Sequence, residues 1–274
     1  MENKIKNLPQ PFRFSQSSLQ DYLDCPRRFQ LRYIQKVQWP AVEVSPYIEN
    51  ERRQIEGQIF HRMVQQFYLG LPPEKISMLA SSENLLRWWN NFISNKPDLS
   101  HYMVFTELAL SARIENHRLT ALFDLVAVKE KEPILIFDWK TYHHKPSHAK
   151  LAERMQTKVY SSLMLHTGNQ NTNILSADID KVEMTYWFAG FPDAPEKFIF
   201  SRTDSKQSWM QLENLVIEID SRQSFPLTED ERICSYCVYR SLCERGIKAG
   251  EGDELESIAP ADFIDFEQIQ EIEF

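Results

Sequence analysis

Apolar residues recur at three- and four-residue spacing in the first third of the chain, which predicts amphipathic helices. The stretch 14–34 is expected to form a helix capped by Ser15 or Ser17, because a serine hydroxyl can accept from a free backbone amide of the first turn. Two more helices are expected over roughly 50–69 and 82–95. The positions expected to face the core in the first two helices are Leu19, Tyr22, Phe29, Tyr33, Ile55, Ile59, Met63 and Phe67.

The pattern then changes to runs of β-branched and aromatic residues, which predict strands. Strands are expected near 103–111, 117–128, 133–140, 181–189 and 196–201, and helices near 149–167 and 204–222. A turn at 129–133 is expected to join two of the strands as a hairpin. The expected order is helices, then a three-strand meander, then a helix and further strands. This order is typical of a mixed α/β domain.

The chain has 274 residues, of which 42% are hydrophobic, and this is enough for one substantial core. We expect a single domain over 1–246 and a separate tail over 247–274. No apolar run approaches the ~18 residues of a membrane-spanning helix. The first residues also lack the apolar stretch of a secretory signal. A cytoplasmic location without membrane contact is therefore expected.

The net charge of −8 argues at first against a nucleic-acid partner, because binding phosphates requires a cationic surface. Nine of the 39 acidic residues and one of the 31 basic residues lie from Ile247 onward, so the rest of the chain holds 30 of each. The body is neutral and can carry a basic groove. The tail alternates acidic and apolar residues, which suits a disordered solubilising segment, a docking peptide or a cover for such a groove.

Four cysteines are the most specific polar pattern: Cys25 stands alone, and Cys234, Cys237 and Cys243 form a C-x2-C-x5-C group. In a reducing compartment such thiols more often bind a metal than form disulfides. Thiolates suit zinc or an iron–sulfur cluster. One remote ligand and a five-residue gap favour the cluster over zinc, which commonly uses two close pairs.

A second pattern combines two carboxylates with a lysine. In the expected strand 133–140, Asp138 and Lys140 are two residues apart and project to the same face. If that strand pairs with 117–128, Asp124 can converge with Asp138 on one Mg²⁺, and Lys140 lies beside it. Taken alone, such acids are more often solvated or paired with a nearby lysine.

The order of the motifs along the chain adds to this pattern. The sequence S-x-S-x-L-x-x-Y-x-x-C-P-x-x-F (15–29) is followed by His61, the Asp124 strand, Asp138-Trp139-Lys140, Q-x-x-x-Y (156–160) and the cysteine group. Over about residues 15–245 the chain resembles the RecB-like nucleases of the PD-(D/E)XK superfamily. Within them it is similar to the iron–sulfur branch, which holds the AddB-type nuclease domain and the CRISPR-associated exonucleases.

The resemblance implies a restriction-endonuclease-like α/β (α+β) core with a mixed sheet, N-terminal helices and a C-terminal iron–sulfur clasp. It implies that His61, Asp124, Asp138 and the backbone carbonyl of Trp139 bind Mg²⁺ or Mn²⁺, with Asp124, Asp138 and Lys140 catalytic. A glycine is usual three residues before the strand aspartate, whereas this chain has alanine there, the smallest replacement.

The same resemblance implies that Gln156 and Tyr160 contact DNA or support the active site. It also implies a [4Fe–4S] cluster with a structural role, whose ligands are Cys25, Cys234, Cys237 and Cys243. Glu107 either faces the site or is exposed. The histidines of the segment 141–150 favour a cationic loop beside the site over a metal centre of their own. The adjacent residues Trp88 and Trp89 favour core or partner packing over base stacking.

The expected activity is that of a metal-dependent deoxyribonuclease, an exonuclease on single-stranded DNA or DNA ends in repair, recombination or CRISPR adaptation. DNA is the expected partner, together with a helicase or another repair or CRISPR protein. One alternative is a weak or inactive DNA-end-binding or scaffold module that retains the iron–sulfur fold. The other is a zinc-binding protein in which the Asp-x-Lys pair is incidental.

Overall fold

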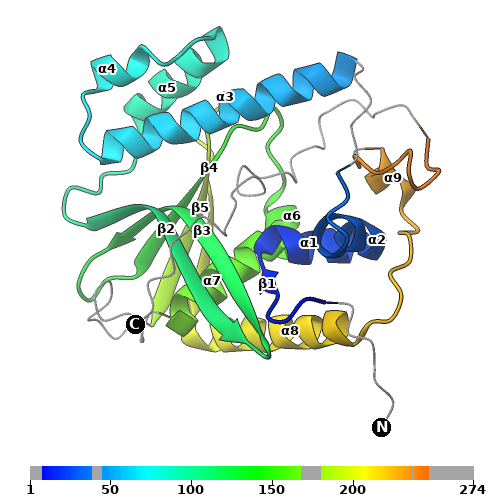
Figure 1. The fold of residues 1–274 in the computed structure, drawn as a ribbon. Coiled ribbons are helices and arrows are strands. Elements are labelled where there is room, and N and C mark those ends of the chain that lie inside the picture. Colours follow the sequence, from blue (N-terminus) through cyan, green and yellow to red (C-terminus); the bar gives the residue numbers. More distant parts are fainter. Residues whose placement is uncertain (1–7, 39–44, 168–179, 236, 247–274) are drawn as a thin grey trace.

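A computed structural model describes residues 8–38, 45–167, 180–235 and 237–246, without the side chains of 45–51 (Figure 1). The expected tail, 247–274, lies outside the described residues. The chain forms a mixed sheet with helices on both faces, as the alternation of patterns predicts. No helix among the described residues is long and apolar enough to cross a membrane.

The sheet has six strands in the order β1-β3-β4-β5-β6, and β2 pairs with β3 outside that path. Strands β2, β3 and β4 form the expected antiparallel meander, whereas β4 and β5 are parallel and β5 and β6 antiparallel. The strands are β1 (Arg13–Phe14), β2 (Met103–Ile114), β3 (His117–Val128), β4 (Ile134–Lys140), β5 (Lys181–Phe188) and β6 (Glu196–Ser201). The short β1, which the sequence pattern did not predict, pairs in parallel with the start of β3.

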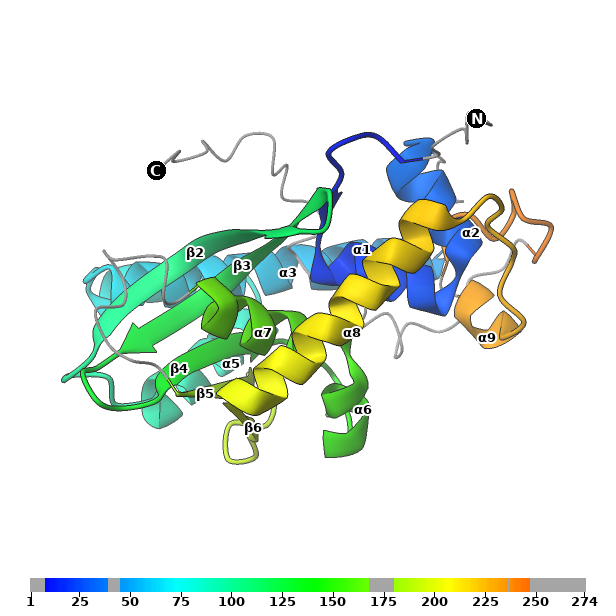
Figure 2. The same cartoon turned by 90° about the horizontal axis from the view of Figure 1, so that it is seen from below.

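Helices α3, α4 and α5 lie over one face of the sheet, while α7 and α8 lie on the other (Figures 1 and 2). Helix α1 packs beside α7, and α9 lies near α2 at the end of the molecule that holds the cysteines. The helices from α3 onward are α3 (Ser45–Tyr68), α4 (Pro73–Ser77), α5 (Glu83–Asn95), α6 (His148–Glu153), α7 (Met155–Thr167), α8 (Arg202–Ser221) and α9 (Glu231–Cys234).

The first predicted helix is divided into α1 (Gln16–Asp24), α2 (Pro26–Phe29) and the π-helical η1 (Gln30–Ile34). Ser15 caps α1 through a reciprocal capping box with Ser18, as expected for a serine at this position. The break lies at Cys25, whose backbone is extended because the ring of the next residue, Pro26, disfavours the helical conformation there. The break places the thiol of Cys25 between two helices.

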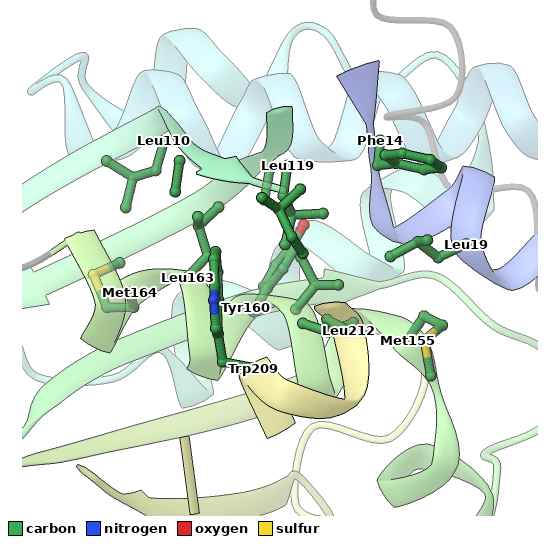
Figure 3. Packing of buried hydrophobic residues seen from close by; sticks show 14 of the residues in the cluster. Phe14, Leu19, Leu110, Leu119, Met155, Tyr160, Leu163, Met164, Trp209 and Leu212 are labelled. Atoms are coloured by element: carbon green, nitrogen blue, oxygen red, sulfur yellow. The ribbon is translucent and has the colours of Figure 1, made fainter. Parts of the chain in front are cut away.

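Two apolar clusters fill the space on the two faces of the sheet. Figure 3 shows part of the larger one, where Leu163 and Tyr160 of α7 pack between the strands and Trp209 and Leu212 of α8. Most predicted core positions are buried or half-buried, including Leu19 and Met63. Ile55 is the exception, since half of its surface is exposed on the outer side of α3, and the expectation for it was wrong.

Candidate active site

Asp138 and Lys140 lie at the C-terminal end of β4. The alternation of β4 places them on the face that packs against α7, together with the buried Ile136. The Lys140 Nζ atom lies 2.6 Å from Asp138 Oδ2, and only 6% and 3% of the two side chains are exposed. The pair is therefore a buried ion pair in contact with little solvent.

Asp124 lies where β3 changes the face to which its side chains point. Leu119, Ala121 and Phe123 pack in the cluster on the α7 side, but Leu125 and Ala127 pack in the cluster on the α3 side. Thr106 of β2 pairs with Leu125, and Leu108 pairs with Phe123, so one pair between β2 and β3 is missing at this point. Local breaks of this kind re-aim side chains and are common next to active sites.

The residue that faces Asp124 across the omitted pair is Glu107, whose backbone has φ = 52°, in the left-handed region. A non-glycine residue is uncommon there and marks a local constraint. Glu107 is half-buried and lies close enough to Asp124 and His61 for both charges to affect it. The sequence left this residue open, and its placement opposite Asp124 depends on a break in the ladder that no local pattern reveals.

Strand β3 and helix α3 bring two more groups to the site. The Asp124 Oδ2 atom accepts from the Trp139 backbone N–H at 2.9 Å, which joins the two predicted metal-binding strands just beyond the pair of Leu125 and Phe137. The His61 Nδ1 atom lies 3.3 Å from Asp124 Oδ1. The structure thus brings together His61, Asp124, Asp138 and Lys140, whose roles in metal binding and catalysis stay predictions. The backbone amide of Trp139 also lies in the site, and metal binding by its carbonyl stays a prediction.

The approach of α3 to the sheet depends on Gly57, one helical turn before His61. A Cβ atom at Gly57 would lie 3.0 Å from the Thr141 Oγ1 atom, closer than ordinary van der Waals contact. Thr141 directly follows β4. The missing side chain therefore lets α3 lie against the end of β4, and this sets the distance from His61 to Asp124.

Gln156 and Tyr160 extend from α7 toward the same strands. The Gln156 Nε2 atom donates to Asp138 Oδ1 at 2.6 Å, and the Tyr160 hydroxyl donates to the Leu122 carbonyl at 2.6 Å. Only 8% of Gln156 and 1% of Tyr160 are exposed. Burial to this degree favours support of the site over direct contact with DNA.

Burial and neighbouring charges shift the pKa values of the residues in the site. Burial raises the pKa of Asp138 to about 6, with a further upward effect of Asp124 and an opposing effect of Lys140. Burial also acts to raise the pKa of Asp124, but the positive charges of His61 and Lys140 outweigh this effect, so the pKa of Asp124 lies below its usual value. The pKa of His61 is raised despite its burial, because the Asp124 carboxylate stabilises the imidazolium. Burial and the charge of Asp124 raise the pKa of Glu107 to about 7.

These side chains fit a hard divalent cation by their chemistry. Carboxylates are the preferred ligands of Mg²⁺, and a histidine is acceptable to Mn²⁺. The Asp138 Oδ2 atom is buried without a well-aligned hydrogen bond, although it forms the ion pair with Lys140. Among the described residues, no group of three or more His, Cys, Asp or Glu side chains is already arranged as a metal site. The donors instead contact protein partners, so metal binding requires their side chains to reorient.

The four cysteines line one small cavity between α1, α2 and the C-terminal segment, together with Arg28. All four are free thiols. Burial raises the pKa of Cys237 to about 11, and burial also raises the pKa values of Cys234 and Cys243. Arg28 forms ion pairs with Asp21 and Asp24, at 2.7 and 2.6 Å. Cys25 and the distant C-x2-C-x5-C group thus line the same cavity, but among the described residues no three of these thiols are arranged as a metal site, and a cluster there stays a prediction.

Other predicted features lie apart from the reactive side chains. Trp88 and Trp89 are buried in the cluster beneath α3, so they belong to the core. In the segment 141–150, Lys145 and His148 form ion pairs with Glu196 of β6. A charged loop matches the expectation for this segment better than a histidine metal site does.

Two carboxylates, a histidine and a lysine therefore lie together at the C-terminal end of β4. Residues 13–116 and 82–244 match the sequence profile of the PD-(D/E)XK nuclease superfamily. The chain therefore belongs to the PD-(D/E)XK nuclease superfamily, whose members usually use divalent metals such as Mg²⁺ or Mn²⁺.

Solved structures with a similar arrangement differ widely in sequence. The crystal structure of SSO0001 aligns with 86% of this chain and 87% of its own, at 12% identity and a TM-score of 0.39. A protein from Eubacterium rectale described as a "putative exonuclease" aligns with 79% of this chain and 84% of its own, at 8% identity and a TM-score of 0.47. No curated protein matches the chain.

Proposed function

We propose that this protein is a metal-dependent DNA exonuclease that acts on single-stranded DNA or DNA ends. The observation that carries the proposal is the convergence of Asp124, Asp138, Lys140 and His61 where the C-terminal end of β4 lies beside the interior of β3. A cytoplasmic location and a role in repair, recombination or CRISPR adaptation belong to the same proposal. A helicase or another partner protein would provide the unwinding.

In this proposal Asp124, Asp138 and His61 hold Mg²⁺ or Mn²⁺, with the Trp139 carbonyl as a further ligand. When bound, such an ion lowers the pKa of a water ligand and offsets charge on the phosphodiester. The Lys140 ammonium is held in place by Asp138 and polarises the attacking water or stabilises the charge that develops on the phosphate oxygens. Gln156 orients the Asp138 carboxylate through its hydrogen bond.

The burial of the reactive groups supports a single-stranded substrate. Taken as whole residues, Asp138 and Lys140 are 2% and 5% exposed, so the scissile phosphate must enter the protein to reach them. A flexible single strand or a frayed end can bend toward such groups, whereas a rigid duplex must be unpaired first, at a cost of a few kcal/mol.

We also propose that the four cysteines bind a [4Fe–4S] cluster that fastens α1 and α2 to the C-terminal segment. Four free thiols around one cavity support this assignment. Bound iron would favour the thiolates over the thiols, offsetting the raised pKa values. Anaerobic purification followed by absorbance and iron analysis tests it: a broad band near ~400 nm with bound iron is expected. Zinc in equimolar amount without that band would contradict it.

The alternative function is an inactive DNA-end-binding or scaffold module. The presence of His61, Asp124, Asp138 and Lys140 together speaks against it. The test uses one oligonucleotide labelled at either end, single-stranded or annealed, with Mg²⁺, Mn²⁺ or EDTA. We expect metal-dependent shortening of the single strand and slower loss of the duplex. DNA binding without cleavage under every metal condition would favour the scaffold.

A further inference from the structure

The side chain of Tyr142 lies between two cations just beyond the end of β4. The Lys140 Nζ atom lies 5.8 Å from the centre of its ring, and the Arg154 guanidinium carbon also lies 5.8 Å from it. The Arg154 Nη1 atom donates to the Tyr142 hydroxyl at 3.0 Å. Tyr142 thus connects the proposed catalytic lysine to an arginine from a different part of the chain.

These groups form a path from the buried carboxylate toward the surface. Asp138 and Lys140 are buried, whereas Tyr142 and Arg154 are both half-buried. The order of contacts is Asp138 to Lys140, Lys140 to Tyr142, and Tyr142 to Arg154. Arg154 is therefore the cation at which this chain of contacts reaches the less deeply buried part of the protein.

The backbone holds Arg154 in a defined place relative to the reactive groups. Arg154 has an extended backbone between α6 and α7, and this break divides the helix that the sequence predicts as continuous. Its N–H donates to the Leu151 carbonyl at 3.3 Å, and its carbonyl accepts from the Lys158 N–H at 3.4 Å. Two residues later, Gln156 is fixed to Asp138. The backbone at Arg154 is therefore fixed relative to Asp138, the carboxylate that is proposed to bind the metal.

We propose that Arg154, oriented by the Tyr142 hydroxyl, binds the phosphate next to the scissile one in a DNA strand. A guanidinium recognises phosphate oxygens through paired N–H donors, and the hydrogen bond to the tyrosine hydroxyl restricts its orientation. This inference rests on the proposed nuclease function and adds a substrate-positioning residue to it. The bound group is either an internal phosphodiester or a terminal 5′-phosphate.

The test compares Arg154→Gln with the parent protein on two substrates in Mn²⁺. One is a single-stranded oligonucleotide, and the other is bis(p-nitrophenyl) phosphate, which has no neighbouring phosphate. We expect KM for the oligonucleotide to rise about 10-fold, the effect of one lost charge-assisted contact. The kcat/KM for the small diester should stay within about 2-fold, since the chemistry is untouched. Arg154→Lys should restore part of the loss. Oligonucleotides with and without a 5′-phosphate identify which phosphate is bound.

Binding without turnover gives a second readout. With Ca²⁺ in place of Mn²⁺, the slope of log affinity against log salt should fall by about 0.7 in Arg154→Gln, as for one lost phosphate contact to a single strand. Arg87→Gln, an equal change of charge at an exposed site on α5, should leave the slope unchanged. Equal losses on both substrates, or an unchanged KM and slope, would overturn the inference. If the parent protein cleaves neither substrate, the proposed function fails, and the salt slope alone then decides the role of Arg154.

Discussion

The hydroxyl of Tyr160 offers a sharp test of whether α7 supports the site or contacts DNA. The hydroxyl is buried and donates to the Leu122 carbonyl, two residues before Asp124, and the ring centroids of Tyr160 and Phe123 are 4.5 Å apart. Tyr160→Phe removes the hydrogen bond and keeps the ring. A typical buried hydrogen bond contributes about 1 kcal/mol to the free energy of unfolding. For a domain of this size that corresponds to a fall of roughly 2–4 °C in Tm.

The consequences for activity follow from the position of that bond. Losing it loosens β3 next to Asp124, so we expect kcat to fall by less than ~10-fold while the Kd for single-stranded DNA stays unchanged. Thermal melting, fluorescence anisotropy with labelled DNA and a cleavage assay measure the three quantities. A Kd weakened about tenfold or more, with an unchanged Tm, would show instead that Tyr160 contacts DNA and does not support β3.

Tyr68 provides a matched control within the same protein. Its hydroxyl is buried and has no hydrogen-bond partner in the part of the chain that the structure describes. Tyr68→Phe removes the same atom without breaking a bond. We therefore expect Tm to stay the same or to rise, because an unsatisfied buried hydroxyl is unfavourable. A fall in Tm equal to that of Tyr160→Phe would show that the hydrogen bond is not the cause.

Three further predictions concern the helix, the third carboxylate and the cysteines. Gly57→Ala should lower kcat by displacing His61, and adding Thr141→Ala should restore it; no recovery in the double variant would contradict the contact. In metal-free protein, Glu107→Gln should raise Tm at pH 8 more than at pH 5. Burial and the charge of Asp124 raise the pKa of the Glu107 carboxyl to about 7, so the carboxyl destabilises the fold once it ionises. Equal shifts of Tm at both pH values would show that Glu107 does not titrate in this way. Cys237→Ser should lower Tm and iron content before it changes cleavage, and unchanged melting and iron would count against a structural cluster.

Most of the longer elements, and the pairing of the strands that hold Asp124 and Asp138, could be predicted from the sequence, because they depend on local patterns. Alternation along 134–140 is enough to place Asp138 and Lys140 on one side of β4. The spacing of Gln156 and Tyr160 likewise predicts that one face of α7 turns toward the same strands. Motif order also predicted that Cys25 belongs with the distant cysteine group; the four residues line one cavity, and their binding of a cluster stays a prediction.

Features that arise from backbone irregularity could not be predicted in this way. The break at Asp124 and Glu107 involves two strands together, and regular alternation would have placed their neighbours on the wrong faces. The helical spacing over 149–167 also does not predict the interruption at Arg154. There the Met155 N–H donates to the Gln20 side chain of α1, a partner far away in the sequence. Such tertiary hydrogen bonds override local propensity. For Ile55 the helical spacing was correct, but the packing partner that would bury it is missing from that side of α3 among the described residues.

The proposed function depends on two aspartates that converge on one metal ion. It is tested by the rate at which Asp138→Asn cleaves labelled single-stranded DNA in Mn²⁺, with Asp98→Asn, at an exposed loop, as the control. We expect a rate at least about 100-fold lower for Asp138→Asn, as for loss of a group that holds the metal, and a parental rate for the control. If Asp138→Asn cleaves at the parental rate, Asp138 does not hold a catalytic metal and the proposed function is wrong.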